Sequence, residues 1–285
     1  MNTWSAIGFE KEKKYFERIL KNESLTHAYL FTGPEMIGKK KFALDLYTMA
    51  NHRDDILPTD ADFKYIVPKK EEDETKIYID NIRELKVFLS FRPLPGPYKC
   101  VIVDDAHCLT DEAENAFLKV LEEPLPRSLI ILVTSQPRLL LPTIISRCQE
   151  IRFSPPALKD IDEFLSDKKL SKGDREFIIT MAGRRLGWLV EVLETHKLER
   201  VKEIIEEFKQ VVRQGTFERL HYAKKIYDNG VYPEYVDLWL RWIRAYGKNP
   251  QKTRAALSKL LNVYQLIAQP QYNHRLALEN FLISL

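Results

Sequence analysis

The stretch His27–Lys41 (HAYLFTGPEMIGKKK) constrains the fold more than any other part of this chain. It joins an apolar strand segment to a helical pattern through Gly33 and Gly38-Lys39, the spacing of the phosphate-binding loop G-x-x-x-x-G-K-[ST]. Glycines let the loop turn its amides towards phosphate oxygens, and the helix N-terminus and the lysine add positive charge. Lys40, however, stands where the motif requires a hydroxyl that binds Mg²⁺. The sequence therefore predicts a strand–loop–helix phosphate site with an altered metal position.

The composition is that of a globular protein with more than one domain. The chain has 285 residues, 45% hydrophobic and 30% charged, which suits two or three folded domains. Its three cysteines lie far apart, so a disulfide framework or a cysteine zinc site is not expected, and a reducing cytoplasm is. The N-terminus carries charges where a signal peptide needs an apolar core, and no run is long enough to span a membrane.

Charge is distributed unevenly along the chain. The net charge is +3, but residues 201–285 hold 13 Lys and Arg against 8 Asp and Glu. This basic excess permits contact with nucleic acid or an acidic partner. A solvated helical surface is the simpler explanation of it.

Strand and helix patterns alternate through the first half of the chain. The expected strands are Ala28–Phe31, Phe63–Pro68, Lys99–Asp105, Leu129–Thr134 and Glu150–Phe153. The expected helices cover residues 6–22, the segment after Lys39, and residues 77–91, 110–122 and 140–147, with Asp80 as a cap and the charge run 69–76 as an exposed turn. All-apolar strands alternating with helices predict a doubly wound parallel α/β domain over residues 1–155.

Beyond Ser154-Pro155-Pro156 the patterns are helical. Three short helices are expected over residues 157–166, 173–182 and 188–194, forming a small helical domain, residues 156–198. Five longer ones are expected over residues 201–212, 217–229, 232–246, 250–268 and 273–285, forming a helical bundle, residues 199–285. The aromatic stripe of residues 232–246 should lie mostly in the core of this bundle.

A second nucleotide-site motif follows the strand at residues 99–105. An apolar strand that ends in an aspartate supplies the Mg²⁺-side acid of P-loop NTPases, and the next carboxylate polarises the attacking water. Asp104 fits the metal role. Asp105 stands where the hydrolytic glutamate is expected and is one methylene shorter.

Four ordered motifs now carry a family resemblance: THAYLFTGP..GK, VIVDDAHCLTDEAENAFLKVLEEP, ILVTSQP and LLPTIISRCQEIRF. They resemble the clamp-loader branch of the AAA+ proteins, and within it the delta-prime subunits of bacterial DNA polymerase III, with the gamma/tau subunits as near relatives. The resemblance covers residues 5–195 well and extends weakly to the end. It implies an AAA+ module (1–155), a helical lid (156–198) and a C-terminal collar that mediates oligomerisation (199–285).

The resemblance also assigns roles to individual residues. It places Gly33, Gly38 and Lys39 in the Walker A loop, with Lys40 at its last position, Asp104 and Asp105 in Walker B, Ser135 at sensor 1, and Arg147 in the Ser-Arg-Cys motif. In the family that arginine reaches a neighbouring subunit's ATP as a finger in trans. A guanidinium suits this task because it is always charged. A helix-end arginine paired with an acid is the alternative for Arg147.

Several positions depart from the family's pattern. Lys40 replaces the metal-binding hydroxyl, Asp105 replaces the glutamate, and Val190 stands at the usual sensor 2 arginine, where Arg184 or Arg185 could substitute only with a changed geometry. Residues 42–99 contain no cysteine, so the zinc module of many relatives is absent, and His52 and His107 are expected to be structural. ATP or ADP binding in a degenerate site is therefore expected, with little turnover and no zinc.

The resulting hypothesis is an ATPase-deficient clamp-loader subunit that donates Arg147 in trans. The resemblance implies a hetero-oligomer with gamma/tau and delta subunits that loads the sliding clamp onto primed DNA. An active gamma-like ATPase that tolerates Lys40 is one alternative. An independent P-loop kinase and a nucleic-acid binder without nucleotide chemistry are two others.

Overall fold

The computed structural model describes residues 4–56, 59–71, 74–94, 96–267, 269 and 271–285. The chain divides into two compact units. The first comprises Met1–Lys168 with Arg184–Gly187, and the second Lys169–Gly183 with Trp188–Leu285. The predicted division into three domains stays a prediction.

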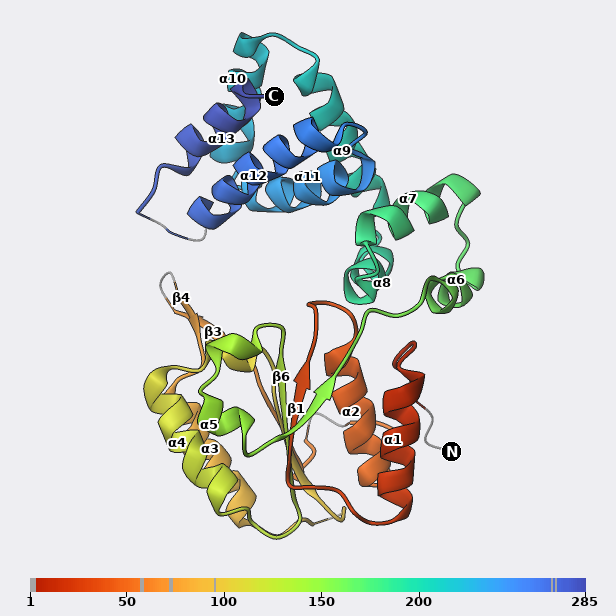
Figure 1. The fold of residues 1–285 in the computed structure, drawn as a ribbon, viewed down its shortest axis with the longest axis vertical. Helices are drawn as coiled ribbons and strands as arrows, with labels where there is room; N and C mark the ends of the chain where they lie inside the picture. The colour runs from red at the N-terminus through yellow and green to blue at the C-terminus, as the bar shows by residue number, and fades with distance from the viewer. Residues whose placement is uncertain (1–3, 57–58, 72–73, 95, 268, 270) are drawn as a thin grey trace. The chain divides into compact units, whose positions relative to one another are not determined.

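The first unit is built on a parallel sheet of five strands in the order β2-β5-β6-β1-β7 (Figure 1). The strands are β1 (Ala28–Thr32), β2 (Phe63–Ile66), β5 (Lys99–Val103), β6 (Ser128–Thr134) and β7 (Gln149–Arg152). All residues of β1, β5 and β6 are buried. Such strands need cover on both faces, which explains their unbroken apolar sequence. The parallel α/β prediction is confirmed.

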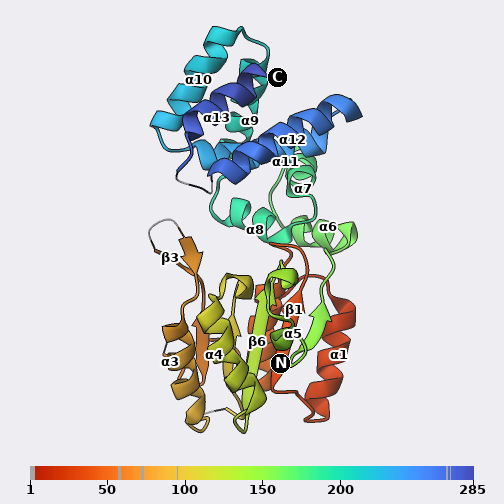
Figure 2. The same ribbon diagram turned by 60° about the vertical axis from the view of Figure 1, so that its left-hand side comes forward.

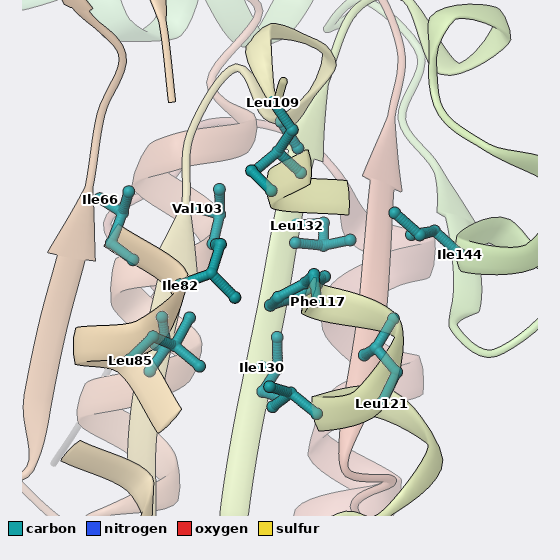
Figure 3. Close-up of a cluster of buried hydrophobic side chains, with 14 of the residues drawn as sticks. Ile66, Ile82, Leu85, Val103, Leu109, Phe117, Leu121, Ile130, Leu132 and Ile144 are labelled. Carbon is teal, nitrogen blue, oxygen red and sulfur yellow. The ribbon is translucent and has the colours of Figure 1, made fainter. Parts of the chain in front are cut away.

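Helices on the two sides of the sheet bury two separate cores. The helices of this unit are α1 (Glu10–Lys21), α2 (Lys39–Ala50), α3 (Ile79–Ser90), α4 (Asp111–Glu122), α5 (Pro142–Ile145) and α6 (Leu158–Ser166), with short 3₁₀ turns η1 (Ala106–Cys108) and η2 (Pro137–Leu139). On one face, α3 and α4 pack on aliphatic strand residues, and Phe117 lies between Ile130 and Leu132 (Figure 3). The spacing of apolar residues in these helices matches the face they bury.

The other face is aromatic. Phe16 of α1 and Phe42 of α2 pack against Tyr29 and Phe31 of β1, and Phe153 completes the group. The ring centroids of Phe31 and Phe153 are 4.9 Å apart. Such ring pairs each contribute about 0.5–1.5 kcal/mol beyond their buried area. These rings cover one face of the strand that leads into the phosphate loop.

Four local expectations differ from the structure. Residues 69–76 form a hairpin, β3 (Lys69–Glu71) and β4 (Glu74–Lys76), whose tip at 72–73 lies outside the described residues. The hairpin is held by backbone hydrogen bonds, and its charged sequence lacks the alternation of apolar residues from which a strand can be predicted. The first helix begins at Glu10 because Gly8 and Phe9 are left-handed (φ 76° and 63°).

The third concerns the start of α3. Asp80 is not its cap but lies in its first turn and pairs with Arg83 at 2.8 Å. The N–H of Tyr78 donates to the side chain of Asn81 instead, at 3.1 Å. The predicted helix at 140–147 is the shorter α5.

A buried polar cluster lies at the opposite end of β5 from the phosphate loop. Asp62 is fully buried and accepts hydrogen bonds from the backbone N–H groups of Leu94 and Gly96, at 2.9 and 3.1 Å. Lys99 Nζ lies 3.4 Å from the same carboxylate, and Arg53 lies 3.6 Å from it. Opposite charges and two amides therefore offset the cost of burying this acid.

The second unit is helical throughout its described residues. It contains α7 (Lys172–Ala182), α9 (Leu198–Val212), α10 (Thr216–Asp228), α11 (Tyr232–Tyr246), α12 (Pro250–Ile267) and α13 (His274–Ile283), and α8 (Leu186–Glu194) begins at the end of the first unit. Helix α11 lies beside α12, and α10 beside α13 (Figure 2). Trp239 is fully buried and stacks on Phe208 at 4.7 Å. Tyr235 and Leu238 are buried as well, so the stripe of α11 is core, as predicted.

Among the described residues, no helix combines the length and the apolar character needed to cross a membrane.

Candidate functional site

The phosphate loop connects β1 to α2 and needs its two glycines for different reasons. Gly33 has φ 141°, and a Cβ there would lie 2.3 Å from the carbonyl oxygen of Phe153. Gly38 has φ 113° and immediately precedes α2, where a Cβ would meet the ring of Phe9 at 3.3 Å. Residues with a Cβ rarely adopt either of these backbone conformations. The structure therefore forms the loop that the motif predicts.

Lys39 is the first residue of α2 and is almost fully buried, with 6% of its surface exposed. Its ammonium donates to the carbonyl oxygens of Gly33 and Pro34 at 2.7 and 2.6 Å. Burial lowers the pKa of Lys39 to about 8, although Asp104 and Asp105 oppose this shift. The lysine thus closes the loop on itself and carries a positive charge that is easily lost.

Lys40 lies against the acid that would face a metal ion. Its ammonium is 4.0 Å from Asp104 Oδ2 and 4.6 Å from the centre of the Tyr65 ring. The hydroxyl of Tyr65 donates to the same Oδ2 at 2.5 Å. Burial and this hydrogen bond raise the pKa of Tyr65. Asp104 is therefore already partnered by two side chains of its own chain.

Asp105 follows β5 in a left-handed conformation, φ 45°. Burial, and next the nearby charge of Asp104, raise the pKa of Asp105. Beside it, His107 Nδ1 lies 3.1 Å from Thr134 Oγ1 at the end of β6, which agrees with a structural histidine. Thr110 then caps the N-terminus of α4, where its side-chain oxygen accepts a hydrogen bond from the N–H of Ala113.

Ser135, the expected sensor 1 residue, contacts the phosphate loop itself. Its hydroxyl donates to Glu35 Oε1 at 3.2 Å. Glu35 was not among the predicted site residues, although it lies within the loop and brings a negative charge to it. An acid at one of the variable positions of G-x-x-x-x-G-K was the available signal.

These side chains surround one cavity of about 550 Å³. All of its lining residues belong to the first unit. The loop and α2 contribute Glu35, Met36, Gly38, Lys39, Lys40, Lys41 and Leu44; the other lining residues are Pro68, Thr75, Asp104, Asp105, His107, Cys108, Val133, Ser135 and Gly187. The volume lies within the usual range for ligand pockets. The structure thus brings together the predicted loop, the two acids and Ser135.

Arg147 lies away from this cavity lining, just after α5. Its guanidinium donates to Glu122 Oε1 at 2.7 Å and to the carbonyl oxygen of Thr143 at 2.9 Å. About a third of the side chain is exposed. Burial raises the pKa of the neighbouring Cys148 to about 12, so that thiol is inert at neutral pH.

Arg184, one of the two arginines considered for sensor 2, binds backbone carbonyl groups. Arg184 donates to the carbonyl oxygens of Pro156 and Pro155, both at 2.9 Å. The nearby Gly187 does line the cavity, and its N–H donates to the carbonyl oxygen of Met36 at 2.5 Å. A Cβ on Gly187 would come within 2.9 Å of that oxygen. The contact with the loop here is therefore made by the backbone of Gly187, whereas the Arg184 side chain binds Pro155 and Pro156.

The described residues contain no group of three or more His, Cys, Asp or Glu side chains that could hold a metal ion.

Comparison with known proteins finds relatives that are subunits of DNA polymerase III. The family model described as "DNA polymerase III, delta subunit" matches residues 8–157. The chain is 29% identical over 240 residues to DNA polymerase III subunit delta' of Bacillus subtilis, covering 77% of this chain and 69% of that protein. It is 34% identical over 157 residues to subunit tau of the same organism, covering 52% of this chain but only 28% of that longer protein.

A solved structure supports the fold. A DNA polymerase III gamma subunit-related protein of Thermotoga maritima aligns with a TM-score of 0.63 at 21% identity, covering 94% of this chain and 97% of the other. The ordered motifs, the parallel sheet and the phosphate loop all agree with the family match, which spans more than half of the sequence. The chain therefore belongs to the DNA polymerase III delta subunit family, as a delta-prime type protein of the clamp-loader group.

Proposed function

We propose that this chain is a clamp-loader subunit in DNA replication that hydrolyses little or no ATP itself and donates Arg147 to the ATP site of a neighbouring subunit. The contact between Lys40 and Asp104 carries the first half of this proposal. A catalytic P-loop site needs that acid and a hydroxyl at position 40 for Mg²⁺, and here an ammonium lies beside the acid.

Two further features weaken hydrolysis at the chain's own site. Asp105 is one methylene shorter than the glutamate that positions water, so its carboxylate reaches less far towards the phosphates. Val190, an apolar residue, stands where the family has an arginine. Each missing part removes stabilisation of the charge that develops on the transferred phosphoryl group.

Arg147 supports the second half of the proposal. Its guanidinium has five N–H donors, and the contacts to Glu122 and Thr143 use only two nitrogen atoms. The exposed part remains open to a partner's phosphate, which could replace the Glu122 carboxylate as an anionic partner. An arginine finger contributes roughly 10³–10⁵ in rate in related enzymes.

The partners follow from the relatives' names and the family resemblance. We infer a hetero-oligomer with gamma/tau and delta subunits in the cytoplasm, acting on the sliding clamp and primed DNA. In this assignment residues 1–155 are the AAA+ module, 156–198 the lid and 199–285 the collar. The aromatic core of α11 supports a stable collar, because it gives the helices a common interior.

Reconstitution tests the trans role directly. The full chain, as wild type or Arg147→Ala, is combined with the partner subunits, clamp and primed DNA of the same organism, and stimulated ATP turnover is measured. Arg147→Ala should remove the turnover of the site next to this subunit while the complex still assembles. Arg152→Ala is the matched control, because Arg152 is also paired with an acid, Glu150, at 3.0 Å and is more exposed. Equal turnover for Arg147→Ala and wild type would overturn the trans role.

The intact loop and cavity favour one second candidate, an active gamma-like ATPase. It predicts Mg²⁺-dependent hydrolysis by the isolated chain, abolished by Lys39→Ala. Steady-state phosphate release from the chain alone separates the two functions. Substantial turnover would support the gamma-like function, and turnover no higher than that of Lys39→Ala would exclude it.

A further inference from the structure

Lys40 decides what kind of phosphate ligand this loop can hold. It is the second residue of α2, and half of its side chain is exposed at the cavity. Its ammonium lies 4.0 Å from Asp104 Oδ2, the oxygen that also accepts the Tyr65 hydroxyl. The position of the metal-binding hydroxyl is therefore taken by a positively charged side chain of the protein itself.

The residues present do not fit Mg²⁺. Magnesium requires oxygen ligands at about 2.0–2.1 Å in near-octahedral geometry. A charged lysine offers no lone pair, and its ammonium repels a cation beside the same acid. Both oxygens of Asp104 already have partners within the chain, because Oδ2 contacts Lys40 and Tyr65 and Oδ1 accepts the N–H of Asp105 at 3.1 Å. This chain's site therefore disagrees with the metal-dependent chemistry of ordinary P-loops.

We propose that the loop binds the terminal phosphates of a nucleotide without a metal ion, with the Lys40 ammonium in place of Mg²⁺. The ligand class is a polyphosphate anion, such as the phosphate chain of ATP or ADP. The proposal rests on the proposed function only in taking the chain's own site as non-hydrolytic.

The cavity supplies the contacts that such an anion needs. The N-terminus of α2 points free amides at the loop, and Lys39 and Lys41 also line the cavity. Lys40 is half exposed, whereas Lys39 is almost fully buried. The Lys40 side chain therefore has room to turn from Asp104 towards a phosphate oxygen, which offers its ammonium another anionic partner.

One ammonium also explains binding without turnover. Mg²⁺ carries two charges and bridges the β- and γ-phosphates in a rigid geometry, which stabilises the transition state. A lysine on a flexible stem neutralises one charge and imposes no such geometry. The result is a site that holds phosphate but does not activate it.

Equilibrium titration of the full chain tests this inference. ATP, ADP and inorganic tripolyphosphate are titrated calorimetrically, in a buffer with excess Mg²⁺ and in one with EDTA. Wild type should bind as tightly in EDTA as with Mg²⁺, or more tightly. Tripolyphosphate reports on the phosphate contacts alone, without the base and sugar.

Two variants and a control sharpen the test. Lys40→Thr restores the motif's hydroxyl and should lose about tenfold or more in affinity in EDTA, with recovery in Mg²⁺. Asp104→Asn removes a negative charge and should hold or raise the affinity in EDTA, whereas it would weaken a metal-dependent site. Lys41→Thr removes one charge from the same cavity, where the ammonium lies 3.8 Å from Asp45, and should create no dependence on metal.

Three results would overturn the proposal: wild-type binding that requires Mg²⁺, no binding in either buffer, or Lys40→Thr binding as tightly as wild type in EDTA. Thermal unfolding checks each variant, and Asp104→Asn decides the question if Lys40→Thr does not fold. The Arg147 experiment is measured on the neighbour's site, so either result can fail while the other stands.

Discussion

Arg147 and Glu122 form an ion pair that joins the end of α5 to the end of α4, with 2.7 Å between the guanidinium nitrogen and Oε1. Both side chains are substantially exposed, so the pair is a weak constraint on the fold. It does fix the direction of the guanidinium in the free chain. If Arg147 acts on a neighbour's phosphate, Glu122 is the group that it must leave.

Glu122→Gln should therefore favour the trans role. The amide keeps the size of the side chain but removes the charge that competes with phosphate. We expect unchanged or higher ATP turnover of the reconstituted complex, and a cost of at most about 1 kcal/mol in the free energy of unfolding. Stimulated hydrolysis and chemical unfolding check the two parts, with Glu150→Gln as control because it frees Arg152 instead. A turnover as low as that of Arg147→Ala would show that Glu122 itself is required.

Gly33→Ala should destabilise the first unit by about 2 kcal/mol or more. The residue has φ 141°, and the new Cβ would lie 2.3 Å from the Phe153 carbonyl oxygen, a backbone atom that cannot move without disturbing the end of the sheet. Gly173→Ala in α7 is the control, since its nearest atom would be 3.9 Å away and alanine favours a helix. Urea unfolding measures both. Equal stability of the two variants would contradict the conclusion that the loop requires glycine at position 33.

The buried charge of Lys39 should be visible in the pH dependence of stability. Its pKa is about 8 in the folded chain and 10.5 ordinarily, so below pH 8 both states are charged and stability does not depend on this group. Between about pH 8 and 10.5 the unfolded chain binds more protons, and stability rises with pH by up to about 3 kcal/mol. Relative to Lys39→Met, wild type should gain stability over that range. A constant difference between the two proteins would rule out the lowered pKa.

Asp62→Asn should cost about 3–5 kcal/mol. The carboxylate is fully buried beside Lys99, and its loss leaves that ammonium with a weaker partner and the amides of Leu94 and Gly96 with a poorer acceptor. Asp80→Asn, which affects an exposed ion pair with Arg83, should change stability little. Thermal and chemical unfolding compare the two. A small effect of Asp62→Asn would mean that the cluster is not a structural anchor.

Much of the fold was predictable because its signals are local. The strands β1, β5 and β6 are continuous apolar runs, and the helices between them have apolar positions at helical spacing. The loop at Gly33–Lys39 is a compact motif, and the backbone conformations at Gly33 and Gly38 require glycine. The hairpin β3–β4 was missed because its charged residues carry no period-two pattern.

The sequence allowed residues of the site to be predicted, but not the contacts between their side chains. The two nucleotide-site motifs predicted Lys39, Asp104 and Asp105 at the loop, and the family resemblance implied Ser135 there. The sequence could not indicate Tyr65, because a tyrosine at the end of another strand has no motif of its own. Nor did it indicate that Ser135 bonds to Glu35, a contact between residues 100 positions apart.

The sequence by itself determined the parallel sheet, the glycine spacing of the phosphate loop and the lysine where the motif has Ser or Thr, because apolar periodicity, glycine spacing and the identity of residue 40 are all local properties. Only the tertiary structure decided what the lysine at that position does. Asp104 and Tyr65 reach it from two neighbouring strands, and a distance between side chains on different strands depends on register and packing. The sequence showed that a hydroxyl is missing, and the fold placed an ammonium beside the acid that would have shared its metal.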